Sequence, residues 1–125
     1  MINYHQMYKS WHILLSGENL VAVAATGSGK TMAFMIPAIM HVNDQPPLDP
    51  DDGPLVLVLA PTRELVQQIS TVATQYGAKS MIRTVSCFGG AQTNPQIKQL
   101  QKGAHVSKLI KKNLILMKNL KKKYT

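Results

Sequence analysis

The sequence predicts an α/β domain in which a parallel sheet is flanked by helices. Three apolar segments, at 20–24, 55–60 and 81–88, have the composition of strands. Segments suited to helices alternate with them, at about 29–41, 63–76 and 94–102. Strands and helices that alternate in this way form parallel sheets through right-handed crossovers. A length of 125 residues allows one domain at most.

The first strand, at 20–24, is apolar without alternation, as strands in parallel sheets tend to be. The loop that follows reads Ala-Ala-Thr-Gly-Ser-Gly-Lys-Thr from Ala24 to Thr31. Glycines let such a loop turn tightly and direct backbone N–H groups at an anion. Lys30 has the reach to contact β- and γ-phosphates, and a hydroxyl like that of Thr31 ligates Mg²⁺. We therefore expect a nucleoside triphosphate site, with Thr31 as its metal ligand, formed by Ala25, Thr26, Gly27, Ser28, Gly29, Lys30 and Thr31.

The helix at 29–41 contains Pro37, which is expected to kink it or to end it early. An acidic, proline-rich surface loop at 43–54 precedes the strand at 55–60. The helix at 63–76 then places Leu65, Ile69, Val72 and Tyr76 on one face.

The third strand, at 81–88, is rich in β-branched residues and ends at Gly89-Gly90. Cys87, the only cysteine, excludes an internal disulfide and fits a reducing compartment. We expect it to be a small buried side chain on this strand rather than a reactive thiol. The four histidines lack metal-ligand spacing.

Composition and charge exclude several classes of protein. No apolar run approaches the roughly 18 residues of a membrane span, and the N-terminus has no secretory signal. Seven of the eight net positive charges belong to the segment 107–125, which holds seven lysines and no acid. Residues 1–106 carry seven basic and six acidic side chains, so global charge is no evidence for nucleic-acid binding.

The segment 107–125 has the pattern of a basic amphipathic helix, with Leu109, Leu116 and Leu120 roughly on one side. Such a helix would contact a membrane surface or an acidic partner; the alternative is that the segment has no selected function. Its Lys121-Lys122-Lys123 run is similar to a short nuclear signal. Localisation stays open between nucleus and cytoplasm, without secretion.

A second motif narrows the class. The segment from Pro61 to Gln68, Pro-Thr-Arg-Glu-Leu-Val-Gln-Gln, closely resembles the Pro-Thr-Arg-Glu-Leu-Ala-x-Gln segment of DEAD-box RNA helicases. The glycine-rich loop matches that family's variant, and Gly89-Gly90 stands where the family has a glycine pair. The resemblance covers about 10–106 and implies an incomplete RecA-like P-loop domain over 1–106. Residues 107–125 form a basic tail unlike the family.

The resemblance also implies roles. ATP and Mg²⁺ would be bound by the glycine-rich loop, and the RNA backbone by Pro61, Thr62, Arg63, Gly89 and Gly90, with Glu64 organising the loops. Contacts of this kind follow backbone shape, so RNA binding would not depend on base sequence. The alternative for the 61–68 motif is a strand-to-helix junction capped by Thr62.

The N-terminal region departs from the family pattern. Family members usually carry an adenine-reading glutamine four residues before the tryptophan equivalent to Trp11, where this chain has Met7. Gln6 is the remaining candidate for adenine recognition, or else a solvated residue near the terminus. His12 replaces the usual proline.

No Asp-Glu-Ala-Asp or Ser-Ala-Thr motif is present, so we assign no catalytic residue in this chain. The leading hypothesis is a truncated DEAD-box-type ATP-dependent RNA helicase that binds nucleotide weakly, does not unwind RNA and is poorly soluble alone. A non-catalytic short isoform that acts as a regulator is the alternative. A different P-loop enzyme, such as a small nucleotide kinase, ranks last. The oligomeric state is left open.

Overall fold

The structure is a computed structural model that describes residues 4–49 and 52–110, without the side chains of residues 4, 6 and 107–110. Two compact units make up the chain, at 1–45 and 46–125.

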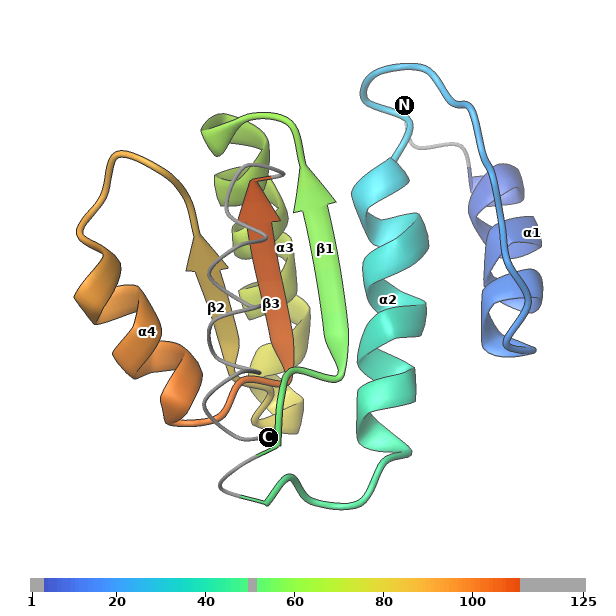
Figure 1. Ribbon diagram of the computed structural model, residues 1–125. Helices are drawn as coiled ribbons and strands as arrows, with labels where there is room; N and C mark the ends of the chain where they lie inside the picture. Colours follow the sequence, from blue (N-terminus) through green and yellow to red (C-terminus); the bar gives the residue numbers. More distant parts are fainter. Residues whose placement is uncertain (1–3, 50–51, 111–125) are drawn as a thin grey trace. The chain divides into compact units, whose positions relative to one another are not determined.

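In the first unit, helices α1 (Tyr4–Leu15) and α2 (Lys30–Asn43) lie side by side (Figure 1). A hydrogen bond of 2.9 Å joins Nε2 of His41 on α2 to the backbone oxygen of Leu14 on α1. The sequence analysis did not predict α1. Its buried side chains, Met7 and Ser10, lie one turn apart, which is the spacing of a helix face.

Helix α2 contains Pro37 but does not end there, so the expected early end is wrong. A proline inside a helix removes one backbone hydrogen bond and crowds the preceding turn. The Pro37 ring is fully buried, and α2 also buries Met35, Ile39 and Val42. Burial of these side chains offsets the local cost, because packing contributes more to helix stability than propensity does.

The segment at 20–24, expected to be a strand, is not one in the structure. The described residues of the first unit contain no strand that could pair with it, and Val21 and Val23 are 95% and 94% exposed. A strand requires a partner for its backbone groups, whereas an apolar composition only favours burial once a partner is present. The prediction relied on composition and is corrected here.

The second unit contains a three-stranded sheet in the order β1-β3-β2. Its elements are β1 (Val56–Ala60), α3 (Arg63–Gly77), the 3₁₀ helix η1 (Ala78–Ser80), β2 (Thr84–Cys87), α4 (Thr93–Gln101) and β3 (Val106–Ile110). Both strand pairs are parallel, with Val106 opposite Val56 on one side and Thr84 on the other. The strands and helices predicted within 55–102 correspond to β1, α3, β2 and α4.

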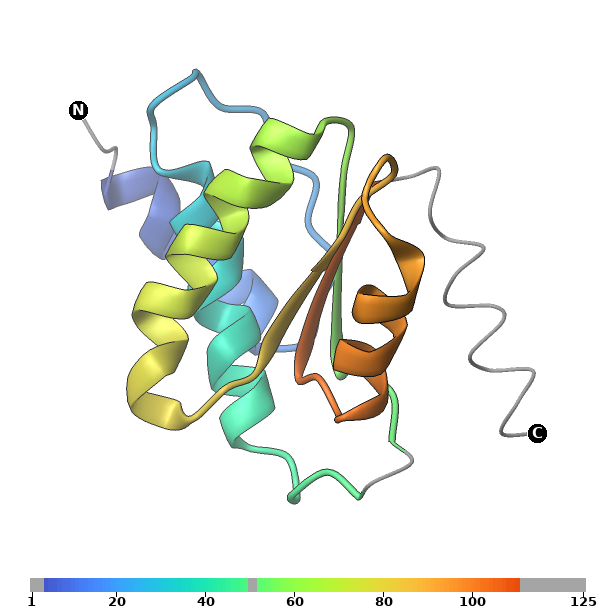
Figure 2. The same cartoon turned by 90° about the vertical axis from the view of Figure 1, so that its left-hand side faces the viewer.

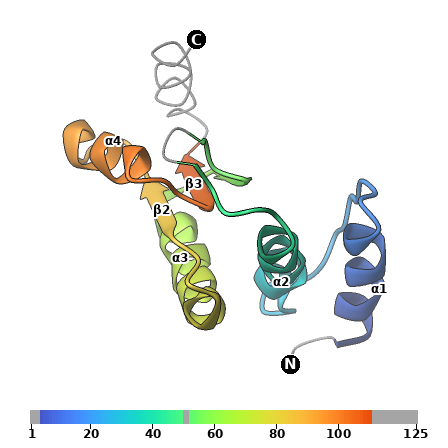
Figure 3. The same ribbon diagram turned by 90° about the horizontal axis from the view of Figure 1, so that it is seen from below.

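Helices α3 and α4 cover opposite faces of the sheet (Figures 2 and 3). Toward α3, the hydroxyl of Ser86 donates to that of Ser70 across 3.1 Å. On the other face, alternate residues of β2 form a buried cluster with residues of α4 and the turn after it: Val85, Cys87, Leu100 and Ala104. Cys87 is completely buried and free, as the sequence predicted, and burial raises the pKa of its thiol.

The buried residues of α3 are mostly different from the apolar set that shares helical spacing in the sequence. The structure buries Val66, Ile69, Ala73 and Gly77, so only Ile69 belongs to both sets. Small residues let the helix lie close to the chain that follows it. A Cβ atom added at Gly77 would lie 3.2 Å from Cβ of Ile82. Leu65, Val72 and Tyr76 stand out in the sequence because they are large and apolar, whereas the close packing of α3 depends on small residues.

Strand β3 corrects the prediction for the C-terminal segment. Residues 107–110, expected to begin a basic amphipathic helix, continue β3 as the central strand of the sheet. The boundary placed after Val106 therefore falls inside a strand. The lysine-rich composition of this segment did not indicate a strand, although the segment forms hydrogen bonds with strands on both sides. Residues 111–125 lie outside the described residues. Among the described helices, none has the length and apolar character to cross a membrane.

Candidate functional site

The glycine-rich loop forms a turn that leads directly into α2. Gly27 and Gly29 have φ angles of 74° and 86°, in the left-handed region that glycine adopts without steric cost. Gly29 is the N-cap of α2, and no side chain caps that end of the helix. The first N–H groups of a helix carry partial positive charge and attract anions. The loop thus has the backbone form of a phosphate site.

The side chain of Lys30, at the end of this loop, hydrogen-bonds to the backbone at its start. Its Nζ donates a hydrogen bond of 2.7 Å to the backbone oxygen of Ala24. The hydroxyl of Ser28 is buried and has no hydrogen-bond partner in the described part of the chain. A buried polar group without a partner costs free energy, so the hydroxyl would gain from a ligand in the loop.

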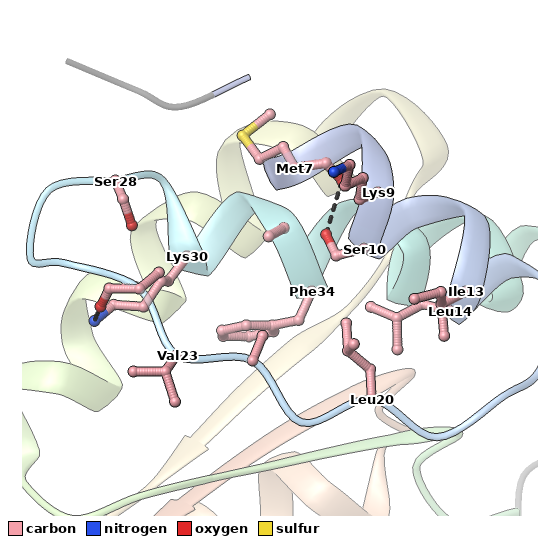
Figure 4. A pocket seen from close by; sticks show the side chains of 13 residues that line it. Met7, Lys9, Ser10, Ile13, Leu14, Leu20, Val23, Ser28, Lys30 and Phe34 are labelled. Carbon is pink, nitrogen blue, oxygen red and sulfur yellow. Dashed lines mark hydrogen bonds between the residues drawn. The ribbon is translucent and has the colours of Figure 1, made fainter. Parts of the chain in front are cut away.

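A pocket of about 530 Å³ opens beside the loop within the first unit (Figure 4). Its walls come from α1, the extended segment before the loop, and α2. Most of the lining is apolar, and Phe34, Leu20, Ile13 and Leu14 contribute to it. Lys30 and Ser28 are polar members at the loop end. Such a pocket suits an apolar group near an anion.

The structure does not test Gln6 as an adenine reader. Gln6 belongs to α1, but its side chain is outside the described residues. Met7, which replaces the family's glutamine, is 4% exposed and lines the pocket. Among the described side chains of α1 that line the pocket, Ser10 alone has a hydroxyl, and it already donates to the backbone oxygen of Met7 at 2.7 Å.

The described residues contain no group of three or more histidine, cysteine, aspartate or glutamate side chains arranged to hold a metal ion. Thr31, the expected Mg²⁺ ligand, lies in the first turn of α2 beside the loop. Its hydroxyl would complete an octahedral site only together with phosphate oxygens and water, which is the usual form of a Mg²⁺ site.

The second unit positions the other set of predicted residues. Pro61 and Thr62 follow the end of β1, and Thr62 is the N-cap of α3. Its Oγ1 accepts a hydrogen bond of 3.3 Å from the backbone N–H of Leu65. The capping role proposed for Thr62 is therefore confirmed, and its side chain fixes how the chain enters α3.

Arg63 and the glycine pair are brought together by Phe88. The guanidinium carbon of Arg63 lies 4.3 Å from the centre of the Phe88 ring, in a cation–π contact. Phe88 immediately precedes Gly89 and Gly90, and Gly90 has a φ of 79°. Because parallel strands end at the same edge of a sheet, the segments after β1 and β2 meet there. Glu64 is exposed in the first turn of α3.

Two residues of this region, Phe88 and Gln96, were not predicted from the sequence. The side-chain amide of Gln96, on α4, hydrogen-bonds both backbone groups of Phe88. One signal was available for Gln96, since it lies one turn before Leu100 on the buried face of α4. A glutamine on an apolar face needs internal partners.

The turn with two left-handed glycines ahead of α2, together with the parallel sheet, defines the class of α/β proteins with a phosphate-type loop. Comparison with known families is more specific. The family model described as DEAD/DEAH box helicase matches residues 5–124. The chain therefore belongs to the DEAD/DEAH box helicase family. The match extends beyond Val106, consistent with the position of β3.

Curated relatives support this membership. The chain is 51% identical over 98 residues to ATP-dependent RNA helicase p62 of Drosophila melanogaster, a match that covers 78% of this chain and 14% of that protein. It is 52% identical over 98 residues to DEAD-box ATP-dependent RNA helicase 20 of Oryza sativa subsp. japonica, covering 78% of this chain and 20% of the relative. The chain thus spans about a fifth or less of these relatives' length.

Solved structures agree on the fold. The RNA-helicase Prp28 from Chaetomium thermophilum bound to ADP aligns with a TM-score of 0.74 and 38% identity, covering 83% of this chain and 25% of that one. The yeast DEAD-box splicing factor Prp28 aligns with a TM-score of 0.69 and 36% identity, covering 78% and 24%. The predicted class, a RecA-like domain represented in part, is confirmed by these neighbours.

Proposed function

We propose that this chain supplies ATP-binding and RNA-binding elements of a DEAD-box ATP-dependent RNA helicase. ATP contacts the loop from Ala25 to Thr31, and Mg²⁺ contacts the hydroxyl of Thr31. The observation that carries this proposal is the uncapped N-terminus of α2 behind a turn with two left-handed glycines. The match to family members described as ATP-dependent RNA helicases, and to a structure bound to ADP, supports it.

The side chain of Lys30 changes its hydrogen-bond partner when ATP binds. When ATP binds, its ammonium exchanges the backbone oxygen of Ala24 for phosphate oxygens, and a charge-assisted hydrogen bond to phosphate is stronger than one to a neutral carbonyl. Binding is weak in these 125 residues, because the pocket beside the loop is mostly apolar and offers a nucleotide few polar groups.

RNA binding is assigned to the edge of the sheet where β1 and β2 end. Pro61, Thr62, Arg63, Gly89 and Gly90 contact the backbone of a single strand, and the bases are not read. The cation–π contact between Arg63 and Phe88 supports this assignment, since it places a guanidinium next to the glycine turn. The residues that the chain provides bind ATP and RNA without unwinding a duplex, because no acidic residue for Mg²⁺ and water activation is identified in them.

The proposal is tested by titrating the purified chain with a fluorescent ATP analogue, with and without Mg²⁺. Lys30→Ala is expected to weaken binding by about tenfold, the loss of one charge-assisted contact. Lys79→Ala, an exposed lysine on η1, is the matched control and should change little. Equal affinities for wild type and Lys30→Ala would contradict the site. RNA-stimulated phosphate release by this chain at rates typical of enzymes would contradict the absence of turnover.

A further inference from the structure

Gln96 is a buried amide that joins α4 to the end of β2. Its side chain is 8% exposed. The backbone N–H of Phe88 donates to its Oε1 at 3.1 Å, and its Nε2 donates to the backbone oxygens of Phe88 and Gln92, each at 3.2 Å. A buried amide costs free energy unless it is hydrogen-bonded, and here both ends of the amide are used.

The two hydrogen bonds between Gln96 and Phe88 resemble those of a residue pair in an antiparallel sheet. In an antiparallel ladder, one residue exchanges both an N–H and a C=O bond with the residue opposite. Gln96 makes the same pair of bonds with its side chain, just after the last residue of β2, Cys87. The backbone of Phe88 is therefore fixed by a helix at the point where the ladder has ended.

Phe88 is next to both groups that are proposed to bind RNA, the glycine turn and Arg63. It directly precedes the Gly89-Gly90 turn, and its ring lies under the Arg63 guanidinium at 4.3 Å. Gly89 and Gly90 are exposed, and apart from the adjacent residues of the chain no described atom lies within 4 Å of a Cβ built on Gly90, so packing does not hold that position. The side chain of Gln96 is the hydrogen-bonded link between α4 and this turn.

We infer that Gln96 is a positioning residue for RNA binding. By holding Phe88, it orients the N–H groups of the glycine turn and the guanidinium of Arg63 before RNA arrives. The inference rests on the proposed RNA contacts of Arg63, Gly89 and Gly90. Gln96 itself is buried and touches no RNA.

The expected effect is a loss of RNA affinity of about tenfold when the amide is removed, because binding must then order about one more backbone residue. Gln96→Met keeps the side-chain length and removes all three hydrogen bonds. Gln99→Met makes the same change at an exposed position of α4 and is the matched control. RNA affinity is measured on the full chain by fluorescence anisotropy with a labelled single-stranded oligonucleotide.

Two further measurements separate positioning from general destabilisation. Affinity for the fluorescent ATP analogue should change less than about twofold in either variant. Hydrogen exchange at the Phe88 amide should accelerate in Gln96→Met alone. Faster exchange with RNA affinity equal to that of Gln99→Met would overturn the inference. If wild type binds no RNA, the proposed RNA-binding function fails and the inference falls with it; if wild type binds RNA, only the comparison of variants decides.

Gln96→Glu provides a test that does not depend on the folding of the methionine variant. At pH 7.5 its carboxylate accepts from Phe88 but repels the carbonyl oxygens of Phe88 and Gln92. Once protonated, the carboxyl has an acceptor and a donor, as the amide does. Burial raises the pKa of such a carboxyl. The ratio of its RNA affinity to that of wild type should rise as the pH is lowered to 5.5, and a ratio independent of pH would contradict the inference.

Discussion

The guanidinium of Arg63 stacks over the ring of Phe88, with 4.3 Å between the guanidinium carbon and the ring centre. The two residues begin α3 and follow β2, so they are 25 positions apart in the sequence and meet only because β1 and β2 end at the same edge. The contact joins the two segments that the sequence marked as RNA-binding. It holds Arg63 in place without using its hydrogen-bond donors, which remain available for phosphate.

Replacing Phe88 with leucine should weaken RNA binding by about threefold to tenfold, the value of a partly exposed cation–π contact. The effect is expected to act through Arg63. In a double-mutant cycle, Phe88→Leu should therefore have little effect once Arg63 is alanine. RNA anisotropy titrations of the four proteins measure this coupling. Independent, additive losses would show that the ring does not position the arginine.

Thr62 contributes to stability apart from any contact with RNA. Thr62→Ala removes the acceptor for the backbone N–H of Leu65 and should lower the free energy of unfolding by about 1 kcal/mol. Thr62→Ser retains a hydroxyl oxygen at the cap and is the matched control. Urea unfolding followed by circular dichroism compares the variants. Equal losses in both would mean that the threonine methyl group, and not the cap, provides the stabilisation.

The local motifs were predictable from the sequence because their structure depends on neighbours in the chain. The junction of β1 and α3 at Thr62 and the turn at Gly89-Gly90 lie where the residues indicated. The central place of β3 was not predictable, since its pairing depends on strands more than 20 positions away and its composition is lysine-rich. Gln96 was missed for a related reason, because its partner Phe88 lies outside α4, in the segment after β2.

The prediction of a strand at 20–24 was wrong for the opposite reason. Its composition favours a strand strongly, but the described residues of its own unit include no strand to pair with it. Local propensity can favour a strand, but the strand forms only when another strand pairs with it.

His105 should make the stability of the chain depend on pH. Its Nδ1 accepts a hydrogen bond of 3.1 Å from the backbone N–H of Arg83, an interaction open only to an unprotonated ring nitrogen. Burial, with a smaller effect from the Arg83 charge, lowers the pKa of His105 below its ordinary value of 6.5. The folded state thus disfavours the proton, and the stabilisation is complete above that value and lost as the pH falls through the folded pKa.

The comparison that isolates His105 is with His105→Asn, whose side-chain oxygen can accept the same bond and does not titrate. Thermal unfolding midpoints of both proteins are measured between pH 8 and pH 5. The midpoint of wild type should fall more steeply below about pH 6.5, where the unfolded histidine takes up its proton. Parallel curves would assign the pH dependence to other groups.

Cys87 should report on global unfolding. Its side chain is completely buried and burial raises the pKa of its thiol, so the reactive thiolate is both scarce and inaccessible in the folded chain. Reaction with a coloured disulfide reagent at pH 7.5 should be slow in buffer and fast in concentrated urea. Rapid labelling in buffer would mean that β2 and α4 separate readily under native conditions.

Val21 and Val23 should limit the solubility of the chain. Both are more than nine-tenths exposed, on a segment for which the described residues of the first unit offer no strand partner. Extended apolar segments of this kind associate with other chains. Val21→Lys combined with Val23→Lys should raise the concentration at which the purified chain stays monodisperse, measured by light scattering. Because both side chains are exposed, the midpoint of unfolding should change little, whereas lysine at the fully buried Val66 should prevent folding. A wild-type chain that melts sharply and remains monomeric at high concentration would contradict this prediction.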